Sequence, residues 1–315
     1  MQEPYNNKHL PDFDDEIDLT ELFRALFQGK WIIISVTSLV SIIGVIYSLS
    51  LPNIYESKAI LVPADESSSM SSAMKNYGGL AGLAGINLPS GEGVTNSEKA
   101  KTKLSSLSFF KNNLLPHIFL PDLMAVKSWD VKTNSLTYDE SIYKKNSNTW
   151  IREVSYPKQQ IPSVQESFKV FRSGHFNISE DKKTGFITLS TKHQSPLVAK
   201  EWNELLINEV NSFYRQKDKS ESQKALVYLN KQIASANLSE IKQVIAELMQ
   251  QETQKLALVE VKQFYVFDYI DPPAVMEQKS EPKRALICIF FAIFGGILSI
   301  ILLLLRHYIF RKKSS

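Results

Sequence analysis

Two long uncharged segments of mainly apolar residues lie near the two ends of the chain. They cover residues 31–51 (WIIISVTSLVSIIGVIYSLSL) and residues 285–305 (ALICIFFAIFGGILSIILLLL). At a rise of 1.5 Å per residue, about 20 apolar residues cross the hydrocarbon core of a bilayer. Basic side chains stand just outside each segment, as they do at membrane interfaces. The pattern therefore predicts two transmembrane helices.

A cleaved signal peptide is the alternative for the first segment. The residues before it are acidic, with DFDDEID at residues 12–18, whereas a signal peptide begins with a basic region. Its apolar stretch is also longer than the core of a signal peptide. We therefore expect a permanent anchor at residues 31–51.

The N-terminal segment, residues 1–30, contains one amphipathic pattern. Five apolar side chains recur at helical spacing, and Asp18 with Glu21 three residues later has the form of a capping box. The five are Leu19, Leu22, Phe23, Leu26 and Phe27. Such a helix can lie in the lipid headgroup plane or pack against a neighbouring subunit, and the sequence leaves both open.

The central segment, residues 52–284, mixes strand and helix patterns. The β-branched stretch at 54–64 predicts a strand, and the alternating segments within 176–193 predict a hairpin with Gly185 at the turn. Helices are expected at 97–114, ending before Pro116, and at 164–172. Residues 117–160 show no clear period and receive no assignment.

The longest helical pattern runs over residues 196–263. Ser195 and Pro196 form a start signal, and neither Pro nor Gly occurs between 197 and 263. The interruption expected within it is SANLSE, where Asn237 ends one helix and Ser239 caps the next. A strand is expected again within residues 264–273. If this strand and the one that ends near His193 belong to one membrane-proximal sheet, the helical segment between them must run out and return. The predicted fold class is α+β: a membrane-proximal α/β base with a long helical hairpin extension, anchored by two transmembrane helices.

The charges outside the apolar segments predict the orientation of the chain. Two spans place both termini on one side, and the last segment, residues 306–315, contains Arg306, Arg311, Lys312 and Lys313. Basic residues favour the cytoplasm, although Lys279, Lys283 and Arg284 weaken this asymmetry. We expect both termini in the cytoplasm and residues 52–284 in the periplasm of a bacterial inner membrane.

Composition excludes several functional classes. A net charge of +3 provides no basic surface for nucleic acid, and the single cysteine, Cys288, excludes an intramolecular disulfide. The five histidines are scattered and lack metal-ligand spacing. Acidic residues are plentiful, but no catalytic arrangement stands out, and Asp12 and Asp14 lie in a short tail without a fold around them. We expect no catalytic residues, no metal and no cofactor.

The glycine-rich stretch YGGLAGLAGINLPSGEG, residues 77–93, superficially resembles a phosphate-binding loop. Gly79, Gly82 and Gly85 recur every three residues, but no Lys-Ser/Thr pair follows and no βαβ unit surrounds them. Nucleotide binding is therefore not expected. Flexible backbone with small apolar side chains suits a mobile loop that contacts a subunit or partner, or a plain linker.

Four stretches together resemble the Wzz chain-length determinants, which are polysaccharide co-polymerases. They are IDLTELFRALFQGKW, PNIYESKAILVPA, SPLVAKEWNELLINEVNSFYRQKD and FYVFDYIDPPAVMEQKSEPKRALI. The resemblance implies a non-enzymatic regulator that forms homo-oligomeric, bell-like rings on the periplasmic face of the inner membrane. It implies control of the modal length of O-antigen or a similar polysaccharide, made on a lipid carrier by a separate polymerase. The partners would be other copies, the polymerase, the growing lipid-linked glycan and the bilayer, and the chain resembles the class without a kinase domain.

Two local patterns are candidate coupling elements. Pro272, Pro273 and Pro282 favour an extended, semi-rigid strut that transmits ring packing to the spans. Gly295 and Gly296 allow another helix to approach closely within the bilayer. The simpler alternatives are that the prolines only end a strand and that the glycines face lipid.

Two other functional classes remain open from the sequence. A periplasmic adaptor of a capsule or drug exporter also uses helical hairpins and would be encoded beside an ATPase and an outer-membrane channel. A two-span periplasmic sensor would need a cytoplasmic output module or partner, and the expected tail of about ten residues argues against a module of its own.

Overall fold

The computed structural model describes residues 26–64 and 96–313. The chain divides into two compact units, Met1–Leu51 with Pro282–Ser315, and Pro52–Glu281. Each unit is described separately. The glycine-rich stretch with Gly79, Gly82 and Gly85 lies outside the described residues, as does most of the predicted N-terminal amphipathic helix.

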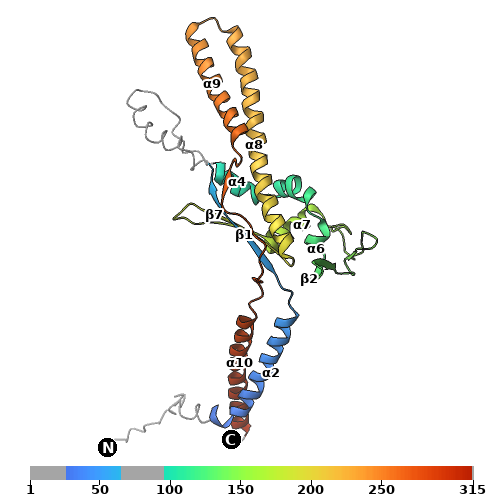
Figure 1. The fold of residues 1–315 in the computed structure, drawn as a ribbon. Coiled ribbons are helices and arrows are strands. Elements are labelled where there is room, and N and C mark those ends of the chain that lie inside the picture. Colours follow the sequence, from blue (N-terminus) through green and yellow to red (C-terminus); the bar gives the residue numbers. More distant parts are fainter. Residues whose placement is uncertain (1–25, 65–95, 314–315) are drawn as a thin grey trace, which may run out of the picture. The chain divides into compact units, whose positions relative to one another are not determined.

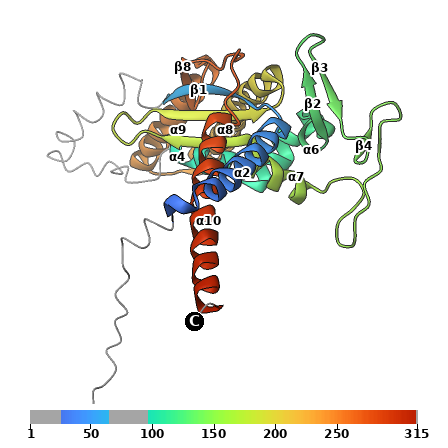
Figure 2. The ribbon, with the colours of Figure 1, turned by 90° about the horizontal axis from the view of Figure 1, so that it is seen from below.

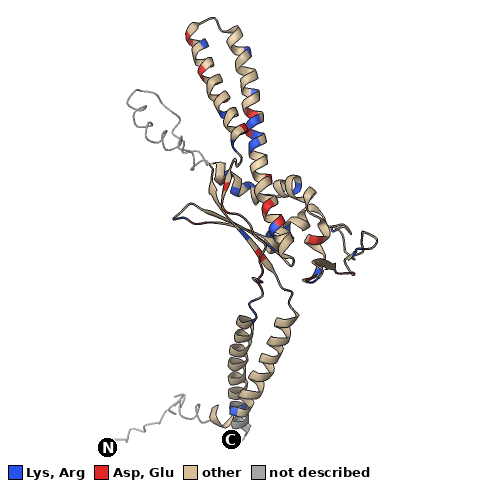
Figure 3. Cartoon of the chain, in the orientation of Figure 1, with Lys and Arg blue, Asp and Glu red and all other residues tan. Residues whose placement is uncertain are grey.

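The first unit consists of two apolar helices. Helix α2 spans Lys30–Ser50 and helix α10 spans Arg284–Lys313, so both predicted helices are confirmed. Both are long and apolar enough to cross a membrane, judged by length and composition. Helix α10 extends past residue 305 and includes the basic residues that follow the apolar segment. Figure 3 shows almost no charge along either helix between its ends.

A four-stranded antiparallel sheet forms the centre of the second unit (Figure 1). Its strand order is β6-β7-β1-β8. The strands are β6 (Phe176–Glu180), β7 (Ile187–His193), β1 (Tyr55–Pro63) and β8 (Phe267–Asp271). Strand β1 pairs with β7 from Tyr55↔His193 to Leu61↔Ile187. The predicted strands and hairpin are confirmed, and Gly185 has the left-handed φ of 72° that the turn requires.

The predicted outgoing and returning helices lie between β7 and β8. Helix α8 spans Pro196–Ser235 and begins with Ser195, whose Oγ accepts a hydrogen bond from the Val198 amide. Helix α9 spans Ser239–Val261 and packs along α8. The break lies within the predicted segment, but α8 ends at Ser235, before Asn237, and Ser239 is the first residue of α9 rather than its cap. The extended backbone of Leu238 (φ −94°, ψ 136°) makes that residue the cap.

The predicted single helix over residues 97–114 is wrong. Helix α4 spans Asn96–Leu104, and after a turn the chain continues as α5 (Leu107–Phe109), the π-turn η1 (Phe110–Leu114) and the 3₁₀ turn η2 (Leu115–His117). Ser106 causes the break, because its Oγ donates to the Lys103 carbonyl (2.7 Å) and accepts from the Phe109 amide (3.3 Å). Pro116 lies inside a helical turn, since the first residues of a turn need no backbone donor.

Short elements occupy the region that the sequence left unassigned. They are α6 (Leu120–Met124), β2 (Val126–Asp130), β3 (Ser135–Tyr138), β4 (Tyr143–Lys144) and β5 (Thr149–Trp150). Helix α7 (Val164–Val170) follows and continues as the π-turn η3 (Phe171–His175). Figure 2 shows the β2–β3 hairpin and β4 to one side of the four-stranded sheet.

The hydrophobic core lies between the sheet, the first half of α8 and the turns that precede the unassigned region. Seven of its 20 buried residues are aromatic, including Phe109, Phe110, Phe171, Phe176 and Trp202. Phe171 stacks on Phe176 with ring centroids 5.7 Å apart and also contacts Phe110 and Trp202. Such rings bury large apolar areas, which fixes the root of the helical hairpin firmly on the sheet.

Candidate functional site

Two buried asparagines attach α8 to the sheet. The Asn203 amide nitrogen donates to the carbonyls of Ser57 in β1 (2.9 Å) and Leu189 in β7 (3.1 Å). The Asn211 Oδ1 accepts from the three successive amides of residues 265–267 at 2.7–3.1 Å, and its Nδ2 donates to the Phe267 carbonyl. Sequence reasoning missed both residues. The signal that could have identified them is that each is a polar residue within the apolar stripe of the helix. The two lie eight positions apart, which places them on the same face.

Ionic and polar contacts hold α8 and α9 together near the sheet. The Arg215 guanidinium donates to the carbonyls of Lys262 and Gln263, both at 2.5 Å, where α9 ends. A cation is favourable at this end of a helix because the helix dipole is negative there. Tyr265 donates to Asp218, and Lys219 forms an ion pair with Glu260. The returning helix is therefore fixed at its base.

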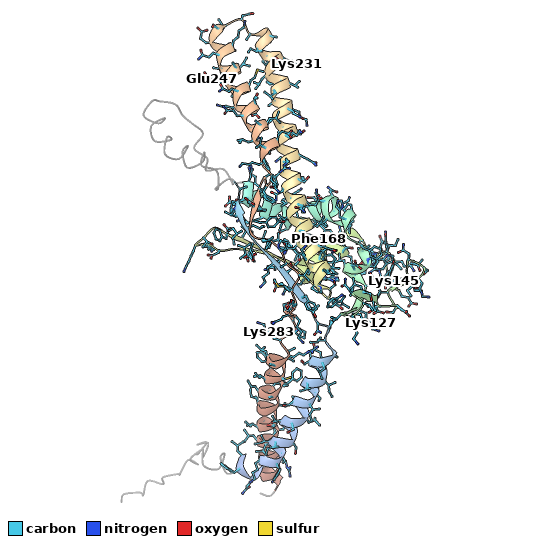
Figure 4. The ribbon with its side chains drawn as sticks, viewed as in Figure 1. Lys127, Lys145, Phe168, Lys231, Glu247 and Lys283 are labelled. Carbon is cyan, nitrogen blue, oxygen red and sulfur yellow. The ribbon has the colours of Figure 1, made fainter. Side chains whose placement is uncertain are left out.

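The outer part of the hairpin, beyond Ser222 on α8 and along most of α9, exposes most of its apolar side chains instead of burying them. Most of its large apolar side chains are exposed: Val227, Tyr228, Leu238, Ile241, Val244 and Leu248. Charged residues are interspersed among them, and Figure 4 places Lys231 on α8 and Glu247 on α9 near the far end of the hairpin. An exposed apolar surface of this length is typical of a contact with another protein.

The proline-containing segment after β8 is extended and attached to the beginning of β1. The Ile54 amide donates to the Glu281 carbonyl (2.9 Å), and the Ser57 hydroxyl donates to the Ala274 carbonyl (2.8 Å). Lys192 forms an ion pair with Glu281 at 2.5 Å. Pro272 is exposed and Pro273 is buried within the second unit, while Pro282 begins the C-terminal part of the first. The segment is thus hydrogen-bonded to the sheet through Ile54 and Ser57. Its role as a strut that transmits ring packing to the spans stays a prediction.

Glycines allow α2 and α10 to pack closely. A Cβ built on Gly295 would lie 2.9 Å from the Val40 Cβ and 3.3 Å from the Thr37 Cα, so a side chain there must displace α2. Gly44 has the same role, although its place in the sequence did not suggest it. A Cβ built on Gly44 would lie 2.5 Å from the Phe291 Cγ. A Cβ built on Gly296 would have no atom of the described residues within 4 Å, so this glycine faces away from α2. The predicted close approach is therefore found at Gly295 and not at Gly296 within the pair.

Arg284 connects the two helices at one end. Its Nε donates to the Ser48 carbonyl (3.2 Å) and its Nη2 to the Leu51 carbonyl (3.5 Å), at the C-terminal end of α2. Free carbonyls and the negative dipole end both favour a guanidinium there. Arg284 therefore stabilises the end of α2 in addition to marking the start of α10.

Two buried histidines lie beside Trp202 in the core. The His175 Nδ1 is 2.7 Å from the Lys192 carbonyl, and the His193 Nε2 is 3.0 Å from the Asp122 carbonyl. The His193 Nδ1 accepts from the Ser195 amide, so its proton is on Nε2. Burial lowers the pKa of each ring to about 4. Both are neutral at pH 7 and serve as hydrogen-bonding core residues.

Residues 15–110 match the family model described as "Chain length determinant protein", Wzz. The resemblance to the Wzz family is confirmed. The Wzz match covers less than a third of the chain and includes α2, β1 and the helical turns up to Phe110. Among curated proteins, none gives a significant match.

Two solved structures are also similar to the chain. The "full-length bacterial polysaccharide co-polymerase" has 14% identity and a TM-score of 0.40, covering 95% of this chain and 100% of that one. The "Fragment of WzzB, Polysaccharide Co-polymerase from Salmonella Typhimurium" has 14% identity and a TM-score of 0.28, covering 73% of this chain and 100% of that one.

Proposed function

We propose that this chain is a non-enzymatic regulator of the bacterial inner membrane that sets the modal length of O-antigen or a related surface polysaccharide. The observation that carries the proposal is the match of residues 15–110 to the Wzz chain length determinant model. Two terminal apolar helices and a sheet with a long helical hairpin are consistent with it. The polysaccharide itself would be made by a separate polymerase.

The proposed topology has two passes. Helices α2 and α10 cross the bilayer, both termini lie in the cytoplasm, and residues 52–284 lie in the periplasm. The length and apolar composition of both helices support the spans. The basic residues after the second span support the orientation.

The proposed assembly is a homo-oligomeric ring that contacts the polymerase and the growing lipid-linked glycan. The exposed apolar side chains of the outer hairpin support a contact between copies. The loop with Gly79, Gly82 and Gly85 is proposed as a second contact with a subunit or partner, on the basis of its small side chains.

Coupling between the ring and the spans is proposed to run through the prolines at 272, 273 and 282 and the glycine pair at 295 and 296, within which Gly295 meets α2 and Gly296 does not. The attachment of residues 274–281 to β1 and the close packing at Gly295 support this route. Gly295→Leu should shorten or randomise the polysaccharide, because the leucine forces α2 and α10 apart. Gly296→Leu is the matched control within the helix pair. If only Gly296→Leu changed the length distribution, an outward contact of α10 would matter instead of the pair.

The experiment that tests the proposed function is a gel of surface polysaccharide from cells with the gene deleted and then restored. We expect a modal ladder that becomes short and random on deletion and returns on complementation. An unchanged O-antigen ladder, with loss of a capsule or of drug export, would instead support the role of an exporter adaptor.

A further inference from the structure

A cleft with aromatic walls lies in the second unit, apart from the contacts described above. Its volume is about 350 Å³, within the range of small-molecule sites. Four parts of the fold line it: Tyr55 at the start of β1, the β2–β3 hairpin, the first turn of α8 and the segment of residues 275–277. Figure 4 marks the β2 end of this region with Lys127. The cleft is thus built by the folded unit and not by one loop.

Two aromatic rings form part of the wall. Tyr55 and Trp129 meet edge to face with centroids 5.4 Å apart and an interplanar angle of 79°. The Trp129 Nε1 donates to the Asn134 Oδ1 at 3.0 Å across the β2–β3 turn. Asn134 has a left-handed φ of 49°, a conformation that asparagine adopts more readily than most residues. The turn therefore fixes the orientation of the indole before any ligand binds.

Three polar groups at the cleft can form further hydrogen bonds. Among the described residues, the Tyr55 hydroxyl and the Glu277 carboxylate make no hydrogen bond or ion pair, and Asn134 uses only its Oδ1. Apolar side chains, including Val131, Pro196 and Met276, complete the lining. The cleft thus combines an apolar wall with a few hydrogen-bonding groups, which is the usual composition of a site that orients a small ligand.

The chemistry of this lining selects among ligand classes. A phosphate or nucleotide would need basic residues, whereas among the described residues that line the cleft the only charged side chain is Glu277. Glu277 also disfavours anionic lipid headgroups, and an acyl chain would leave the polar groups without partners. A pyranose ring fits both features, because one face presents C–H groups to an aromatic ring and its edge presents hydroxyls.

We propose that this cleft binds one sugar residue of the glycan, packed against the Tyr55 and Trp129 rings and hydrogen-bonded by Glu277 and Asn134. The inference rests on the proposed function for the presence of a glycan. Within the site, Trp129 provides direct contact, whereas Asn134 is also a positioning residue that holds the indole. The cleft would then give the protein direct contact with the polymer whose length it regulates.

The test measures binding of short oligosaccharides to the full chain in lipid nanodiscs. The probe is surface polysaccharide from the source cells, cut by mild acid, and binding is followed by saturation-transfer NMR and titration against empty discs. Trp129→Ala should weaken binding about tenfold, because a stacking surface is lost. Glu277→Gln, on an exposed segment, should weaken it severalfold without affecting the core. Tyr156→Ala is the matched control, since Tyr156 is 97% exposed and outside the cleft.

Asn134→Gly separates positioning from contact. Glycine tolerates the left-handed turn but removes the acceptor for the indole, so weaker binding with an unchanged fold supports the positioning role. Binding unchanged in Trp129→Ala and Glu277→Gln would overturn the proposal. If the wild-type protein binds no oligosaccharide yet its gene restores the modal ladder, the cleft proposal fails while the proposed function stands.

Discussion

The two halves of α8 have opposite surroundings although they form one continuous helix. From Pro196 to Ser222 a stripe of residues is buried within the folded unit, whereas beyond Ser222 no residue of α8 is buried. Helix α9 buries only Ile245 and Val259 along its 23 residues. The inner half is therefore stabilised by the fold of its own chain. The outer hairpin has a small core of its own, so an external contact would contribute much of its stability.

The largest effect is expected from Asn211→Ala at the inner half. The variant leaves three amides and one carbonyl at the start of β8 without their side-chain partner. Unsatisfied buried groups cost about 1–3 kcal/mol each, so we expect the free energy of unfolding to fall by roughly 4 kcal/mol. Chemical unfolding of the full chain in detergent, followed by tryptophan fluorescence, measures this. A loss below about 1 kcal/mol would mean that water replaces the asparagine.

A pair of leucine variants compares the stability contributed by the inner half of α8 with that contributed by the outer hairpin. Leu206→Ala removes a fully buried side chain and should cost roughly 3 kcal/mol, whereas Leu248→Ala, 43% exposed on α9, should change unfolding by less than about 0.5 kcal/mol. If the proposed oligomer forms through the outer hairpin, Leu248→Ala should instead lower the stability of that oligomer. Size-exclusion chromatography with light scattering measures this effect. Equal effects of both variants on unfolding would contradict the difference between the halves.

The buried histidines predict a pH dependence for the inner half. Their pKa values of about 4 lie below the unfolded value of 6.5, so only the unfolded chain takes up protons between these limits. Stability should therefore fall as pH falls from 6.5 towards 4, by about 2 kcal/mol per histidine at pH 5. Burial also raises the pKa of Asp122, which acts in the opposite direction. Unfolding of the wild type and of His193→Gln across this range isolates the histidine contribution, and identical profiles would refute it.

The smallest effect is expected at the boundary between the halves. Among the described residues, the fully buried Ser222 hydroxyl has no hydrogen-bond partner. Ser222→Ala should be neutral or stabilise the chain by up to about 1 kcal/mol, because it removes a polar group that burial penalises. A thermal melt beside Ser235→Ala, an exposed serine on the same helix, provides the measurement. A clear destabilisation would indicate a buried water at Ser222.

The hydrophobic pattern predicted much of the fold. The start of α8 at Ser195–Pro196, the break before Ser239 and the turn at Gly185 follow from local chemistry, so they could be read from the sequence. The α8–α9 return was expected on the condition that the strands on either side of it belong to one sheet, and β7 and β8 do.

The contacts that hold these elements together could not be predicted in this way. Asn203 and Asn211 act on strands distant in sequence, and their partners are backbone atoms that carry no sequence signal. The strands β4 and β5 have two residues each, which is too short for a period. Gly44 was missed because its role depends on Phe291 in another helix. The cleft at Trp129 combines four distant segments and was invisible for the same reason.

The position of β1 in the sheet has a consequence for how the protein is made. Strand β1 ends at Pro63, but its neighbours β7 and β8 begin at Ile187 and Phe267. At about 5–20 residues per second, synthesis leaves β1 without its first neighbour for roughly 6–25 s and without its second for longer. During that interval the strand has two open edges, and unpaired edges are the form in which strands aggregate. A cell that makes this protein must therefore shield one short segment through most of translation, and a chain truncated before β8 would be expected to misfold at that strand.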